Sequence, residues 1–299
     1  MLKVKRLTYI FLVCVAVQCV AQETEADREK RFREQAGAAG QDTTYGWNHS
    51  VVTGLNLTQI SFKDWASGGE NALAYTMFLN GSSVNNEEKI RWTNGYKVAF
   101  GQTRLGSQGL RKTDDEIYFE ALLVYKLGVY VNPYASATMR TQFAKGYTYD
   151  NLGNETAVSK FFDPGYLTQS IGVAYQPVAE VTTRFGVALR EVITSDFAAY
   201  ADDPATTAVE KTKVEGGMES VTDVNWKFAE NMIFTSKLET FAPFKTLDKI
   251  IVRSDNTISA KVNKYVVTSL NVQFINDVTV TPLTQMKQVL SLGLSYTLL

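Results

Sequence analysis

Few residues of this chain could carry acid–base or nucleophilic catalysis. His49 is the single histidine among 299 residues. A Ser-His-Asp or Ser-His-Asn hydrolase at a membrane would need His49 beside a serine in the membrane-facing plane. In an extended segment the adjacent Ser50 points to the opposite face, and no acid lies nearby in the sequence. A structural or incidental His49 is therefore favoured over a catalytic one, and a histidine metal site lacks the further ligands it needs.

Carboxylates are the other candidates for chemistry. Asp114, Asp115 and Glu116 fall in one predicted outer loop, and Asp202 and Asp203 fall in another. Either group could supply oxygen ligands for weak calcium binding, but solvation of a loop is the simpler explanation. No phosphate loop or dinucleotide fingerprint occurs in a strand-turn-helix context. We therefore expect no enzyme activity, no cofactor and no metal.

Charge excludes one further class of function. The chain has 30 basic and 31 acidic residues and a formal net charge of −1, which argues against a nucleic-acid partner. The N-terminus instead indicates export. Residues 1–21 have the three parts of a secretory signal peptide, with basic residues at 3–6, an apolar stretch at 7–17 and a small-residue cleavage site ending at Ala21. Residues 22–44 mix both charges without an apolar stripe, which predicts a periplasmic lead-in that is helical or flexible.

From residue 45 to 299 the sequence alternates between apolar and polar or small residues. The last segment shows this clearly, because Leu290, Leu292 and Leu294 alternate with Ser291 and Gly293. Such alternation is typical of strands with one apolar face. We predict twelve strands, at about 47–61, 71–84, 88–103, 115–127, 129–144, 165–176, 179–194, 211–228, 231–242, 248–262, 265–278 and 286–299.

The predicted connections alternate in length. The even-numbered ones are tight, as at 85–87 or 263–264, and most odd-numbered ones are long, as at 145–165. Short turns at one end and long loops at the other, with an even number of strands, are typical of bacterial outer-membrane barrels. We therefore predict an all-β, antiparallel up-and-down transmembrane barrel in the cell outer membrane, with outer-membrane lipid around it. A soluble secreted sandwich or lipocalin-like barrel is the alternative.

The polar faces of these strands carry charges of both signs. A charge at the lipid midplane costs about 2–4 kcal/mol, so these residues must face the lumen if the barrel exists. The predicted lumen charges are Arg91, Lys97, Glu120, Lys126, Arg140, Glu180, Arg184, Arg190, Glu215, Glu219, Asp223, Lys227, Lys237 and Glu239. Nearly balanced charge suggests pairs that cross a narrow lumen. The sequence favours a passive small-solute channel, and leaves open a closed barrel held by outer-membrane protein partners as a structural or assembly subunit.

One short segment is unusual in composition. Residues 65–71, Trp-Ala-Ser-Gly-Gly-Glu-Asn, separate the first two predicted strands, and the glycines Gly68 and Gly69 permit the positive φ of a compact turn. We expect an outer turn formed by Trp65, Gly68, Gly69, Glu70 and Asn71, with the indole at the membrane edge. Partner binding by Trp65 is the less favoured alternative.

This segment and several others resemble a known family. The shared features are Gln59 to Phe62 leading into 65–71, followed by the segments 111–117, 141–143, 146–149, 164–167, 224–226 and 261–265. Their order resembles the Bacteroidota secreted β proteins of domain of unknown function 3078, over nearly all of the chain after residue 45. The resemblance implies an outer-membrane barrel of undefined activity and contributes no catalytic residues.

Overall fold

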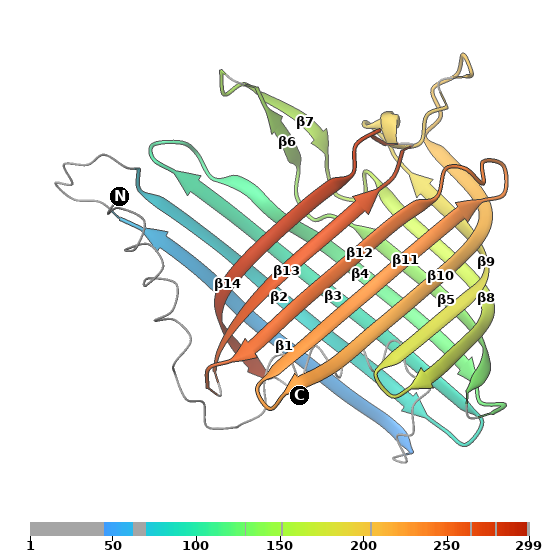
Figure 1. Ribbon diagram of the computed structural model, residues 1–299. Helices are drawn as coiled ribbons and strands as arrows, with labels where there is room; N and C mark the ends of the chain where they lie inside the picture. The colour runs from blue at the N-terminus through green and yellow to red at the C-terminus, as the bar shows by residue number, and fades with distance from the viewer. Residues whose placement is uncertain are drawn as a thin grey trace, which may run out of the picture.

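A computed structural model describes residues 45–61, 70–128, 130–150, 152–203, 205–263, 265–278 and 280–297. Twelve antiparallel strands close into one barrel (Figure 1), which confirms the predicted fold class and strand number. The barrel strands are β1 (Gly46–Ile60), β2 (Ala72–Asn86), β3 (Ile90–Leu105), β4 (Arg111–Tyr125), β5 (Val131–Thr141), β8 (Gly165–Val178), β9 (Val181–Ile193), β10 (Thr212–Ala229), β11 (Met232–Pro243), β12 (Ile251–Lys261), β13 (Val266–Asn276) and β14 (Gln285–Thr297). The predicted bounds 1–21 and 22–44 lie outside the described residues and stay predictions.

Each barrel strand pairs with the strand before it and the strand after it. Tight turns such as 87–89 and 179–180 lie at one end, here called the turn end, and the longer connections lie at the other, the loop end. At the closing seam, the described residues of β1 and β14 pair from Val52–Thr297 to Asn56–Gly293, whereas β1 pairs with β2 along its full length. The seam is therefore formed by a short ladder.

Two predicted loops differ from the structure. β4 begins at Arg111, so Asp114, Asp115 and Glu116 lie in a strand and not in an outer loop. Cross-strand pairing with β3, as between Asp114 and Gly101, continues the ladder through these acids. Each has a partner, since Asp114 and Glu116 form ion pairs and Asp115 accepts from the backbone of 143–144. The predicted loop at 145–165 contains a second, two-stranded sheet of β6 (Gly146–Tyr149) and β7 (Glu155–Ser159), which stands above the loop end in Figure 1.

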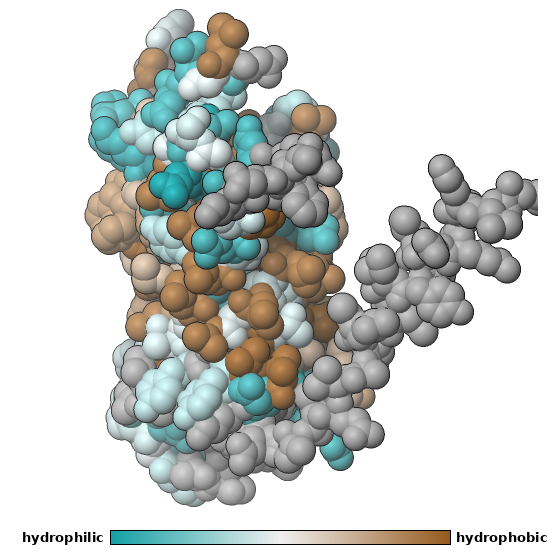
Figure 2. Space-filling view, turned by 90° about the vertical axis from the view of Figure 1, so that its left-hand side faces the viewer, coloured by the Kyte–Doolittle hydropathy of each residue, from teal (hydrophilic) through white to brown (hydrophobic). Residues whose placement is uncertain are grey.

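The outside of the barrel is apolar. Alternate residues of each strand point out, and on β14 the side chains of Leu290, Leu292 and Leu294 are 74%, 60% and 59% exposed. Figure 2 looks onto the side of the barrel that lies at the left in Figure 1 and shows hydrophobic residues gathered across its middle, with hydrophilic ones above. A soluble barrel would carry polar residues at these positions, so the exterior is that of a barrel that spans a lipid bilayer. No helix in the described ranges is long and apolar enough to cross a membrane.

Candidate functional site in the barrel lumen

A cluster of charges crosses the middle of the lumen. Arg184 on β9 donates to Glu120 on β4, with 2.7 Å between Nη2 and Oε1, and both side chains are only 2% exposed. Lys237 on β11 donates to the second oxygen of Glu120 at 3.0 Å and to the Tyr118 hydroxyl at 3.0 Å. Asp223 on β10 lies 4.0 Å from Arg184. Because β4 is separated from β9 and from β11 by other strands, these bonds run through the interior and join distant parts of the barrel wall.

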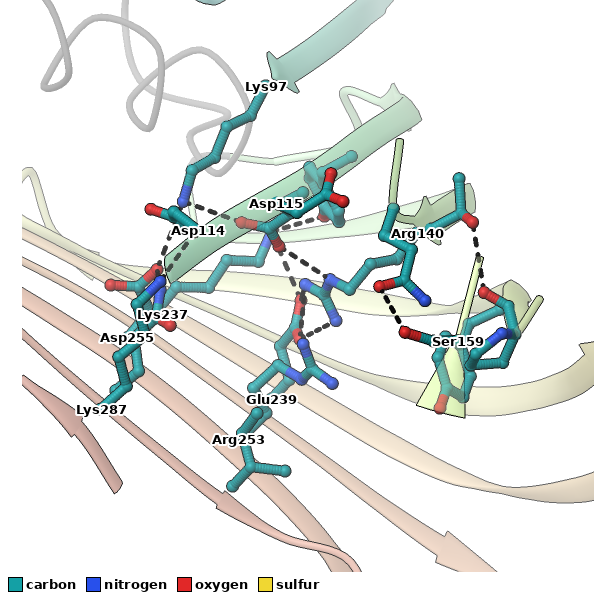
Figure 3. A pocket seen from close by; sticks show the side chains of 18 of the residues that line it. Lys97, Asp114, Asp115, Arg140, Ser159, Lys237, Glu239, Arg253, Asp255 and Lys287 are labelled. Atoms are coloured by element: carbon teal, nitrogen blue, oxygen red, sulfur yellow. Dashed lines mark hydrogen bonds and ion pairs between the residues drawn. The ribbon is translucent and has the colours of Figure 1, made fainter. Parts of the chain in front are cut away.

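A second cluster lies nearer the loop end. Arg140 on β5 forms a forked pair with Glu239 on β11, with 3.2 Å from each of two guanidinium nitrogens to Oε2, and its Nε lies 3.2 Å from Glu116. Glu116 also pairs with Lys97 at 3.1 Å, and Lys97 reaches Asp255 at 3.7 Å. Figure 3 shows Lys97 and Arg140 converging from one side of the barrel on Glu239 and Asp255 from the other. The lumen is thus crossed by ion pairs at more than one level.

Further pairs lie closer to the loops. Arg190 contacts Asp277 at 3.3 Å and Glu215 at 3.8 Å, and Lys287 contacts Asp114 at 2.7 Å. Side-chain exposure rises from 2% at Arg184 to 35% at Lys287. Water therefore has most access to the lumen from the loop end.

The turn-end half of the lumen is filled. Small polar and apolar side chains from around the barrel are buried there, with Thr235 at 1% and Leu122 at 2% exposed. Leu122, Val124, Tyr134 and Ala174 form a buried apolar cluster among them. The buried side chains of this half also include Val52, Ser82, Val84, Thr93, Asn132, Thr182, Asn225, Ile233, Thr257, Ser259 and Val267. An open pore would wet these inward-facing residues, so the structure has a lumen closed at its turn end.

The loop-end half contains open space, here called the vestibule. A cavity of about 440 Å³ is lined by charged residues from opposite walls, among them Lys97, Glu116, Arg140, Arg253 and Asp255. A second cavity of about 280 Å³ shares Arg140, Tyr166, Tyr200, Glu239, Arg253 and Ile275 with the first. The charged residues that line the combined space are mixed in sign.

The predicted lumen charges separate into three groups. Lys97, Glu120, Arg140, Arg184, Arg190, Glu215, Asp223, Lys237 and Glu239 form the ion pairs above, and Glu219 lines the smaller cavity. Arg91 is buried at the turn end of β3. Lys126 follows β4 and donates to Asn86 and to the Glu87 carbonyl in the tight turn, Glu180 lies in the β8–β9 turn, and Lys227 is exposed near the end of β10.

Several residues of the network had not been singled out from the sequence. Arg253 and Asp255 lie within a correctly predicted strand, and the alternation of Arg253, Asp255 and Thr257 along β12 was the signal for an inward face. Glu116 was missed because it had been placed in a loop. Tyr118 is not a charged residue, so the sequence does not single it out. Only its place two residues before Glu120, on the same inward face of β4, could have indicated it.

The candidates for other chemistry lie apart from this network. His49 Nδ1 is 2.8 Å from the Ser83 hydroxyl and the ring stacks on Trp47, and among the described residues no carboxylate or amide side chain bonds to it. Asp115 accepts bonds from Lys112 and from two backbone N–H groups, and Asp202 accepts one from the Glu210 N–H. The described ranges hold no group of three or more acids or histidines arranged for a metal.

The outer loops are tied to the barrel by a buried acid. Asp163 is 1% exposed and accepts hydrogen bonds from the backbone N–H groups of Ser195 and Asp196, at 3.0 and 2.7 Å. Burial alone would raise the pKa of Asp163, but these hydrogen bonds hold it below the usual 3.8. Of the predicted outer turn, Trp65, Gly68 and Gly69 lie outside the described residues. Glu70 is exposed, and the Asn71 carbonyl accepts from the Gly106 N–H at 2.7 Å.

Solved structures with a similar fold include an outer-membrane channel from Pseudomonas putida F1, with 11% identity and a TM-score of 0.42, over 88% of this chain and 97% of that chain. The translocator domain of the autotransporter NalP from Neisseria meningitidis is 10% identical with a TM-score of 0.38, over 91% and 95% of the two chains. The NanC porin is 8% identical with a TM-score of 0.38, over 82% and 97%. These proteins are similar to this chain in fold alone.

A search of curated proteins finds no match to this chain. A family model does match part of it, over the strands that supply Lys97, Glu116 and Glu120. Residues 57–147 match the family described as Protein of unknown function (DUF3078), which confirms the predicted family resemblance over that part of the chain.

Proposed function

We propose that this protein is a non-enzymatic, integral outer-membrane β-barrel that is closed to passive diffusion and presents a polar vestibule and its loops to the outside. The observation that carries the proposal is the buried bridge of Arg184, Glu120 and Lys237 across the lumen. These charges, paired at 2–15% side-chain exposure, are largely shielded from water at that level, as expected where the lumen is blocked. The packed turn-end half below the bridge supports the same conclusion.

The apolar exterior supports the outer-membrane location. Strand residues that point outward, such as Leu290 and Trp92, are exposed and apolar, and the charges lie inside. The arrangement satisfies the backbone within a closed ladder and keeps charge out of lipid. The tight turns would then face the periplasm and the long connections the outside, as is usual for outer-membrane barrels.

A scaffold role with protein partners is supported by the loop end. Phe143 and Phe161, which flank the β6–β7 hairpin, are 65% and 59% exposed, and Leu152 at its tip is 88% exposed. Exposed large apolar side chains on a projecting hairpin are typical of protein-binding surfaces. A closed barrel with such a surface fits the structural or assembly subunit of an outer-membrane complex.

A passive small-solute channel is the second candidate. It is favoured by the mixed-charge cavity of about 440 Å³ that enters the lumen from the loop end. For this function the central bridge would have to open, and a lumen with both signs of charge would give weak ion selectivity.

Planar-bilayer conductance of the refolded mature chain separates the two, with heat-modifiable gel mobility as the check on folding. A folded barrel without unitary steps supports the closed barrel, and stable steps support the channel. A matched pair of variants tests the geometry directly, because the only two cysteines of the chain lie in the predicted signal peptide. Thr138→Cys lies in the vestibule lining and should react with a membrane-impermeant maleimide, whereas Thr235→Cys, at a site 1% exposed, should not. Equal labelling of both would contradict a closed turn end.

A further inference from the structure

Arg253 differs from the other cations of the vestibule. Lys97, Lys112, Arg140, Arg190, Lys237 and Lys287 each have a carboxylate oxygen within 4.0 Å. Arg253 has neither an ion pair nor a hydrogen bond with any residue that the structure describes, although it is half-buried and lines both cavities. Glu116 and Glu239 act on this guanidinium only from beyond ion-pair distance, and both already pair with Arg140. A guanidinium removed from much of its water without a carboxylate in contact is costly, so this position favours an anionic ligand.

Two hydroxyl groups line the same space. Tyr166 on β8 and Tyr200 in the short helix 198–200 border both cavities with Arg253, and neither hydroxyl bonds to another described residue. Burial raises the pKa of Tyr200, so its O–H stays protonated and remains a donor at neutral pH. The three side chains offer a guanidinium fork and two O–H donors toward one space.

We propose that the vestibule binds the oxyanion of a small solute, a carboxylate or a phosphate, through Arg253, with Tyr166 and Tyr200 as further donors. The planar fork of arginine matches the two oxygens of such a group. Cavities of about 440 and 280 Å³ admit a small molecule. Glu116 and Glu239 line the same space and would repel a polyanion, so the ligand has one oxyanion and a neutral or cationic remainder.

This site goes beyond the proposed function and does not depend on it. A vestibule closed at the turn end and an open channel could both bind such a ligand, because the three side chains lie on the loop side of the Arg184 bridge. Binding and conductance are also measured separately, so the failure of one proposal is distinguishable from the failure of the other.

Isothermal titration calorimetry of the refolded barrel in detergent tests the site, with inorganic phosphate and acetate as the two probes. Wild type should bind at least one of them saturably, and the better probe identifies phosphate or carboxylate as the recognised group. Arg253→Gln should weaken that binding by about tenfold or more, which is the loss expected for hydrogen bonds to a charged partner. Arg104→Gln, at an exposed position near the loop end of β3 outside both cavity linings, is the matched control and should bind as wild type does.

Two further variants keep the test decisive. Arg253→Lys retains the charge without the fork and should recover only part of the affinity. Tyr166→Phe removes one donor from a residue that pairs in the β8–β9 ladder through its backbone, and should weaken binding severalfold if Arg253→Gln fails to fold. The proposal is overturned if neither probe binds wild type saturably, or if the folded variants and wild type bind equally.

Discussion

Replacing Arg184 by methionine tests whether the lumen bridge is as buried as the structure indicates. Arg184 lies 2.7 Å from Glu120, and both side chains are 2% exposed. Removing one partner of a buried ion pair typically costs about 3–5 kcal/mol, because the other charge stays buried. Glu120 keeps Lys237 at 3.0 Å, so we expect a loss near the lower end, about 3 kcal/mol.

Lys287→Met is the matched control for that prediction. Lys287 and Asp114 are also 2.7 Å apart and also join two strands that are not neighbours, but their side chains are 35% and 27% exposed. The pair should therefore contribute less than about 1 kcal/mol, as solvent-screened pairs do. The comparison isolates burial, since the distance between the charged atoms is the same.

Urea unfolding of the refolded barrel in lipid vesicles, followed by fluorescence of the four tryptophans, measures both losses. A double-mutant cycle with Glu120→Gln should give a coupling to Arg184 on the order of 2 kcal/mol. If Arg184→Met and Lys287→Met lower the stability by the same small amount, the bridge is hydrated. In that case the bridge would not close the lumen.

Two more predictions concern the loops and the strand packing. Asp163→Asn should destabilise the fold at neutral pH. Because the folded pKa of Asp163 lies below 3.8, the carboxylate stabilises the fold above that pH, and this stabilisation is lost as the pH falls further. Thermal melts of wild type and variant should therefore converge only in acid. Gly172→Ala should lower the stability by about 1–3 kcal/mol, seen as a lower urea midpoint, because a Cβ there would clash with the Phe185 carbonyl oxygen. Gly109→Ala, with open space around it, should change nothing measurable.

Strand positions could be predicted because the membrane imposes a simple rule on the sequence. Outward residues must be apolar at every second position, and the segment from Leu290 to Leu294 shows this without exception. The predicted strand ends agree with the structure to within a few residues where a tight turn follows the strand. They were least accurate at the loop end, where β4 extends to Arg111 past acids that a sequence would place in solvent.

The partners of the lumen charges could not be predicted in the same way. The alternation along each strand places Glu120 and Arg184 inside the barrel. Whether these two side chains meet across the interior depends on the shape of the closed barrel. Sequence distance gives no hint, since the two residues are 64 positions apart. The same limit applies to Arg253, whose lack of a partner is a property of the assembled vestibule and not of its segment.

The distribution of these charges explains how one barrel can be closed and still hold a polar cavity. Near the turn end, most of the buried side chains, such as Thr235 and Leu122, are small or apolar and fill the interior. At mid-height, long side chains from opposite walls reach each other, and burial is compensated because each charge has a partner of the opposite sign. Toward the loops the pairs are more exposed, and Arg253 has no contact ion pair among the described residues, so this level keeps both space and a cation available to a ligand. A solute that enters from outside would therefore meet a binding group before it meets the barrier.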